Sequence, residues 1–228
     1  MSLKNALLGF LNYGSMTGYE LKKIFDPSIG HFWNAELSQM YPTLKQLESE
    51  GLVEMAVEVQ ADKPNRKVYS ITDDGARELS DWLAQPATPD QVREPLMIKV
   101  FFGAALARRE LIAVLRHRAD ELRRTIETQE QGRILIGKFT ETFGLDREGF
   151  FWDLTVDAGL KHCNAGIQWI EEAIDRIERL DDSFFAAERS RVDAIDVRRA
   201  MEMLDKLKAE MPEVFVGPYR SGENDKSR

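Results

Sequence analysis

Apolar residues recur at the spacing of an α-helix over the first fifty residues of the chain. The pattern predicts one helix over residues 3–13 and a second that begins after Thr17, because Thr17 and Glu20 have the spacing of a capping box. We expect the second helix to end near Phe25, where Asp26-Pro27 follows. A third helix is predicted over about 36–50, with the apolar positions Leu37, Met40, Leu44 and Leu47. Pro42 lies early in this stretch, so we expect the helix to begin near Ser38 or to bend at Pro42.

After Gly51 the apolar period changes from 3.6 to 2, which is typical of half-buried β-strands. Two such segments, over 53–60 and 66–71, flank a turn-rich stretch at 61–65 and predict a β-hairpin. Thr72 then caps a fourth helix, and Pro86 and Pro89 follow it. The order helix, helix, helix, hairpin, helix is that of a winged helix-turn-helix, in which the hairpin is the wing.

From about residue 95 the pattern is helical almost throughout, with helices predicted over 95–106, 108–136, 150–180 and 190–211. The 150–180 helix carries an unbroken heptad of apolar positions: Val156, Leu160, Cys163, Ile167, Ile170, Ile174 and Ile177. This stripe can pack against the 108–136 helix of the same chain, or it can form a seam between two copies of the chain. We favour the dimer seam, because a single winged helix makes few base contacts and two half-sites are the usual arrangement.

The expected fold is therefore mainly α with a small β-hairpin: a winged helix-turn-helix domain and a C-terminal α-helical dimerisation domain. We place the first domain at 1–86, a linker at 87–94 and the helical domain at 95–212. The polar tail at 213–228 has no periodicity, and we expect it to be disordered.

Composition limits where the protein acts and how it can bind DNA. The 228 residues include no apolar run long enough to span a membrane, one cysteine, and no signal-peptide pattern at the N-terminus, so we expect a cytoplasmic protein. The net charge is −8, and residues 1–85 hold eight Lys and Arg against twelve Asp and Glu, a balance of −4. DNA binding would therefore need basic groups that are gathered locally.

Two groups of residues are candidates for such contacts. The second helix of a helix-turn-helix enters the major groove, where Gln can pair with adenine and Ser or Thr can bond either base type. The candidates on this helix are Ser38, Gln39, Tyr41, Thr43 and Lys45. Cations at the wing tip can hold phosphates or enter a minor groove, and Lys22 and Lys23 could add phosphate contacts. The wing candidates are Lys63, Arg66 and Lys67. An ordinary solvated helix face, and protection of an edge strand by lysine, are the alternatives.

The sequence holds no catalytic or metal-binding motif, so we expect neither an enzyme nor a cofactor. Aromatic residues gather in the C-terminal half, where they could line a pocket for a flat, apolar effector or could simply belong to the core. The candidate pocket residues are Phe101, Phe102, Phe151, Trp152 and Trp169.

Three segments resemble the PadR family of transcriptional regulators. Residues 39–53, with Tyr41-Pro42 and Gly51-Leu52, resemble its recognition helix; residues 17–21 resemble its second helix, and 66–75 its wing strand and the start of its fourth helix. The resemblance implies a repressor that is dimeric through C-terminal helices and is often released from its operator by a small phenolic or aromatic ligand. It also implies that Tyr41, Lys45 and the wing cations face DNA. The C-terminal half is similar to the virulence-activator type of arm in size and helicity.

The favoured hypothesis is thus a ligand-responsive repressor that binds a near-palindromic operator as a homodimer. The alternative is a winged-helix protein-interaction module that does not bind DNA, which the acidic net charge mildly favours.

Overall fold

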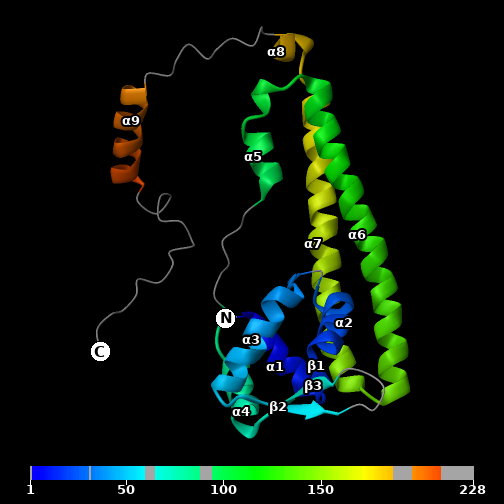
Figure 1. The fold of residues 1–228 in the computed structure, drawn as a ribbon. Helices are drawn as coiled ribbons and strands as arrows, with labels where there is room; N and C mark the ends of the chain where they lie inside the picture. The colour runs from blue at the N-terminus through cyan, green and yellow to red at the C-terminus, as the bar shows by residue number, and fades with distance from the viewer. Residues whose placement is uncertain (1, 31, 60–64, 88–93, 187–196, 212–228) are drawn as a thin grey trace. The chain divides into compact units, whose positions relative to one another are not determined.

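The structure, a computed structural model, describes residues 2–30, 32–59, 65–87, 94–186 and 197–211 (Figure 1). The chain divides into two compact units, Met1–Ala87 with Gln129–Gly159 and Thr88–Thr128 with Leu160–Arg228, so both long helices contribute to each unit. Lys63, residues 88–93 of the predicted linker and the predicted tail at 213–228 lie outside the described residues.

The described residues up to 87 form four helices and a three-stranded sheet in the order of a winged helix-turn-helix, and the predicted hairpin supplies two of the strands. The helices are α1 (Ser2–Leu11), α2 (Gly18–Ser28), α3 (Leu37–Ser49) and α4 (Asp73–Leu83), and the strands are β1 (Met16–Thr17), β2 (Val53–Glu58) and β3 (Arg66–Ile71). All strands are antiparallel in the order β1-β3-β2, with Val53 opposite Ile71 and Glu58 opposite Arg66. The sequence did not predict β1, because two residues are too few to show an alternating pattern.

Apolar residues from every helix of the winged domain meet in one core. The fully buried members are Leu7, Leu8, Leu21, Phe25, Met40, Leu44 and Leu47. Complete burial of a side chain of this size stabilises the fold by about 1.5–3 kcal/mol. Because three of these residues lie on one side of α3, the core fixes which side of that helix faces outward.

α2 is longer than predicted, whereas α3 begins within one residue of the predicted start. α2 continues through Pro27 to Ser28, whose hydroxyl donates to the carbonyl of Ile24 at 2.7 Å. α3 begins at Leu37 and includes Pro42. The capping box of α2 forms as predicted, since the Glu20 N–H donates to Thr17 Oγ1 and the Thr17 N–H donates to Glu20 Oε2. The Thr17 N–H also lowers the pKa of Glu20, because it favours the charged carboxylate.

The rest of the described chain is helical. Its elements are α5 (Pro95–Phe101), η1 (Gly103–Ala105), α6 (Arg108–Phe143), α7 (Asp146–Glu178), α8 (Asp182–Ala186) and α9 (Val197–Glu210). The helix predicted over 95–106 is interrupted after Phe101, where a short 3₁₀ turn follows and Gly103 packs against Leu111. α6 is longer than predicted and stops at Gly144, which adopts a positive φ of 64°. None of the described helices is long and apolar enough to cross a membrane.

The heptad of α7 packs largely within the chain, the alternative that the sequence left open, and a seam between two copies stays a prediction. Cys163, Ile170 and Ile174 are buried against α6, where their partners are Leu111, Leu115, Ala119 and Leu122. Ile167 and Ile177 pack at the edge of this core, and Val156, in the first unit, is also buried. Leu160 is half-buried. Burial within one chain removes most of this apolar stripe from any surface that a second copy could contact.

Gly75 offers a direct test of the junction between wing and α4. A Cβ at this position would overlap the carbonyl oxygen of Leu52, which is held in place because it accepts from the Thr72 N–H at 3.1 Å. We predict that Gly75→Ala lowers the free energy of unfolding by about 1–3 kcal/mol, measured by urea denaturation. The matched control is Gly9→Ala in α1, where nothing lies within 4 Å and a gain of about 0.4–1 kcal/mol is expected. Equal stability of Gly75→Ala and the parent chain would contradict this packing.

Candidate nucleic-acid interface

The side of α3 opposite its buried stripe carries the residues predicted to read DNA. Ser38, Gln39, Tyr41 and Lys45 are exposed, and Thr43 is half-buried. Lys45 forms no ion pair with any residue that the structure describes. This exposed polar side is what a recognition helix presents to a major groove.

Two of the predicted base-reading side chains are already hydrogen-bonded within α3. The oxygen Oε1 of Gln39 accepts from the Glu36 backbone N–H at 3.0 Å, one turn earlier. The Thr43 hydroxyl donates to the Gln39 carbonyl at 2.8 Å. The Thr43 proton is therefore used inside the helix, whereas the amide nitrogen of Gln39 stays available as a donor.

The ring of Tyr41 rests on Gly18, the first residue of α2. A Cβ built on Gly18 would lie 2.6 Å from Tyr41 Cε1 and 2.9 Å from Cζ, so only a glycine accommodates the ring in this position. Tyr41 is nevertheless 45% exposed. The contact is at the hydroxyl end of the ring, since Tyr41 Oη would lie 3.2 Å from the same Cβ, and the exposed remainder of the side chain can still be reached by a ligand outside the domain.

The two wing cations that the structure describes have different surroundings. Arg66 binds Glu58, directly across the hairpin, at 2.6 Å, and its other nitrogen lies 3.5 Å from Glu20. The hydrogen bond to Glu58 raises the pKa of Arg66. Lys67 is exposed, and no described residue forms an ion pair with it. Lys67 is thus available for a phosphate, whereas Arg66 would have to leave two carboxylates.

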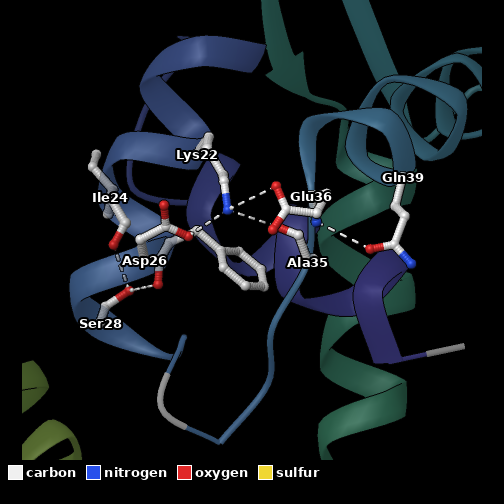
Figure 2. Close-up of polar contacts among 8 residues, drawn as sticks. Lys22, Ile24, Asp26, Ser28, Ala35, Glu36 and Gln39 are labelled. Atoms are coloured by element: carbon white, nitrogen blue, oxygen red, sulfur yellow. Dashed lines mark hydrogen bonds and ion pairs between the residues drawn. The ribbon is translucent and has the colours of Figure 1, made fainter.

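Lys22 does not point outward as the sequence suggested. Its Nζ lies 2.8 Å from Asp26 Oδ1 and 2.9 Å from the Ala35 carbonyl oxygen, in the segment just before α3 (Figure 2). The neighbouring Lys23 is exposed.

Two family models cover most of the chain. Residues 7–81 match the transcriptional regulator PadR-like family, and residues 92–178 match the virulence activator alpha C-terminal family. The chain belongs to the PadR-like family of transcriptional regulators. Both models end before α8, so α8 and α9 lie beyond the part that they describe.

Several relatives of this PadR-like chain are characterised or solved. The negative transcriptional regulator PadR of Bacillus subtilis is 29% identical over 179 residues, which cover 78% of this chain and 98% of that protein. Its structure in complex with operator DNA has a TM-score of 0.67 at 28% identity and covers 78% of this chain and 99% of that one. The structure of the Vibrio cholerae virulence activator AphA has a TM-score of 0.61 at 27% identity, and the match covers 77% of this chain and 98% of that one. These matches confirm the family resemblance and the winged-helix fold.

The aromatic candidates of this PadR-like protein are divided between the two units. Phe101 and Phe102 form an edge-to-face pair in the second unit, which also contains Trp169. Phe151 and Trp152 lie in the first unit. There Trp152 meets Tyr13 edge-to-face at 5.9 Å and lies 6.2 Å from Phe139, two neighbours that the sequence did not single out. Tyr13 lies just past the end of α1, where periodicity no longer indicates its direction.

We predict that Gly18→Ala displaces the ring of Tyr41 without destabilising the domain. The added Cβ meets the far end of a side chain that can rotate away, so the free energy of unfolding should change by less than about 1 kcal/mol. Affinity for operator DNA should fall as much as it does in Tyr41→Ala, because both changes remove the ring from its position. Binding is measured by fluorescence anisotropy and stability by urea denaturation. Normal affinity in Gly18→Ala would show that this position of Tyr41 is not used for DNA.

Proposed function

We propose that this protein is a transcriptional repressor that binds operator DNA as a homodimer and is released by a small aromatic or phenolic ligand. The observation that carries the proposal is the exposed polar side of α3 together with the exposed wing cation Lys67, which pairs with no described residue, in a domain whose sequence is otherwise acidic. Isolated basic groups on an acidic surface mark where a polyanion can approach. We also propose that the protein acts in the cytoplasm, where a regulator meets its operator DNA.

The relatives support both partners. The Bacillus subtilis PadR, described as a negative regulator, has been solved with operator DNA and with p-coumaric acid. We infer that this protein likewise binds operator DNA and a small phenolic acid. The aromatic group around Trp152, with Tyr13 and Phe139, offers ring faces and edges against which a flat phenolic acid could stack. We propose that Phe151, the neighbour of Trp152 in sequence, also belongs to the effector site.

Within the proposed interface the residues divide by role. Ser38, Gln39 and Tyr41 lie toward the start of α3 and are proposed to meet base edges, and Lys45 a base or a phosphate. Lys67, with Lys63 beside the same turn in sequence, is proposed to bind phosphates. Arg66 would bind a phosphate of DNA only if it gave up its ion pairs with Glu58 and Glu20.

The exposed apolar side of α5 is our proposed contact with the second copy, in place of the α7 heptad. Phe101 is 81% exposed and Ile98 63% exposed, with Met97 and Phe102 beside them. Large apolar side chains gathered at the surface of one helix indicate a protein interface. The homodimer then supplies the two recognition helices that a two-fold operator requires.

The test of DNA binding is a titration of the protein with its own promoter DNA across a salt series. We predict specific binding that weakens steeply as salt rises, because phosphate contacts release counterions. Lys67→Ala should reduce the slope of log affinity against log salt by about one. Lys45→Ala should weaken operator binding by roughly 1–3 kcal/mol while the domain stays folded.

The charge-matched control for this titration is Lys206→Ala, which removes an exposed cation of α9 outside both family models. It should change neither the salt slope nor the affinity for operator DNA. Addition of p-coumaric acid to the bound complex should release the DNA. A folded dimer with no salt-dependent DNA binding would contradict the repressor and support the protein-interaction alternative.

The dimer interface is tested separately. We predict that Phe101→Asp converts the dimer to a monomer in sedimentation experiments, because an aspartate buried between two apolar surfaces has no partner for its charge. Leu83→Asp replaces a side chain that is 67% exposed on α4 and serves as the control. A Phe101→Asp variant that remains dimeric would place the interface elsewhere.

A further inference from the structure

Lys22 connects α2 with the start of α3 (Figure 2). Its ammonium donates to Asp26 Oδ1 at 2.8 Å on its own helix and to the carbonyl oxygen of Ala35 at 2.9 Å, and it lies 3.7 Å from Glu36 Oε2. The Lys22 side chain is only 18% exposed. A lysine ammonium has three donors; here two of them are hydrogen-bonded within the protein, and the Glu36 carboxylate lies at ion-pair distance.

The acceptors on the α3 side lie at the point where the chain enters that helix. Ala35 is buried, and Glu36 is the N-cap of α3. A bond from α2 to the Ala35 carbonyl therefore restrains the position of the first turn of α3 relative to α2. The hydrogen bond to Asp26 raises the pKa of Lys22, because it favours the charged ammonium.

Glu36 in turn restrains the side chain of Gln39. The Glu36 N–H donates to Gln39 Oε1 at 3.0 Å, and a backbone N–H can bond only to the oxygen of the amide. The amide nitrogen of Gln39 is thereby left as the free end of the side chain. With Oε1 turned toward the Glu36 N–H, the free end of Gln39 is a donor for acceptors such as N7 and O6 of guanine or O4 of thymine; the two-bond pairing with adenine would require Oε1 to leave or share its present bond.

Lys22 also compensates two carboxylates beside this turn. The side chains of Asp26 and Glu36 are 49% and 65% exposed. Without the ammonium, both would present uncompensated negative charge next to the residues proposed to meet DNA.

We propose that Lys22 is a positioning residue of the operator-binding surface: it holds the start of α3 through Ala35 and Glu36 and thereby presents Gln39 to the bases as a hydrogen-bond donor. The inference rests on the proposed function. It assigns to Lys22 a part in sequence specificity and none in direct phosphate binding.

The experiment compares Lys22→Met, Lys22→Arg and Lys23→Met in the full-length protein. Lys22→Met keeps most of the alkyl chain and loses the ammonium, Lys22→Arg restores donors and charge, and Lys23→Met loses the same charge from the adjacent exposed position. Affinity for promoter DNA and for unrelated DNA of equal length is measured across a salt series. Thermal denaturation establishes that each variant is folded.

We expect Lys22→Met to lower the ratio of specific to non-specific affinity about tenfold while the salt slope stays unchanged. Lys22→Arg should recover most of the ratio. Lys23→Met should leave the ratio as it is in the parent chain. Equal losses on both DNAs together with a slope reduced by about one would identify Lys22 as a phosphate contact and overturn the proposal.

Hydrogen exchange in the free protein tests the restraint without DNA. The Glu36 amide should exchange faster in Lys22→Met than in the parent chain or in Lys23→Met, because its bond to Gln39 is then less well held. Unchanged exchange would overturn the restraint whether or not DNA binds. If the parent chain shows no preference for promoter DNA, the proposed function fails, and with it the role of Lys22 in specificity; the exchange result still reports the restraint itself.

Discussion

Met40, Leu44 and Leu47 are fully buried in the core of the winged domain, and this burial determines what α3 can offer to a partner. A helix with one side packed against neighbouring elements presents only its opposite side, and here that side carries Gln39 and Lys45. Two contacts with α2 then fix details of this exposed side. Gly18 makes room for the Tyr41 ring, and Lys22 holds the segment that enters the helix.

Electrostatics limit how strongly one copy can bind DNA. Several cations of the winged domain already serve the fold, since Lys4 binds Glu50 and Glu78, and Arg66 binds Glu58. Only a few cations stay available to bind phosphates, and the domain that carries them is acidic overall. Their contribution to the free energy of DNA binding should therefore be small. Two copies on a two-fold operator double the number of contacts, so affinity and dimerisation should be closely linked.

Much of the winged domain could be predicted because its signals are local. The capping box of Thr17 and Glu20 and the buried stripe of α3 each lie within a few residues of sequence. The α7 heptad shows why other features could not be predicted: its period establishes that Ile170 is buried but not whether α6 or a second chain buries it. Similarly, the spacing of Lys22 and Asp26 suits a helical ion pair, whereas its bond to the Ala35 carbonyl exists only once α2 and α3 have packed. The base-contacting residues themselves stay predictions.

Footprinting on promoter DNA tests the central claim most directly, because it reports both the contact with DNA and its symmetry. The account predicts two protected stretches whose centres are separated by about 10 base pairs, or by a multiple of that spacing, related by a two-fold axis. Both stretches should disappear together as a phenolic ligand is added. Uniform or absent protection at concentrations where the protein is a folded dimer would contradict the claim that α3 and the wing form a sequence-specific operator-binding surface.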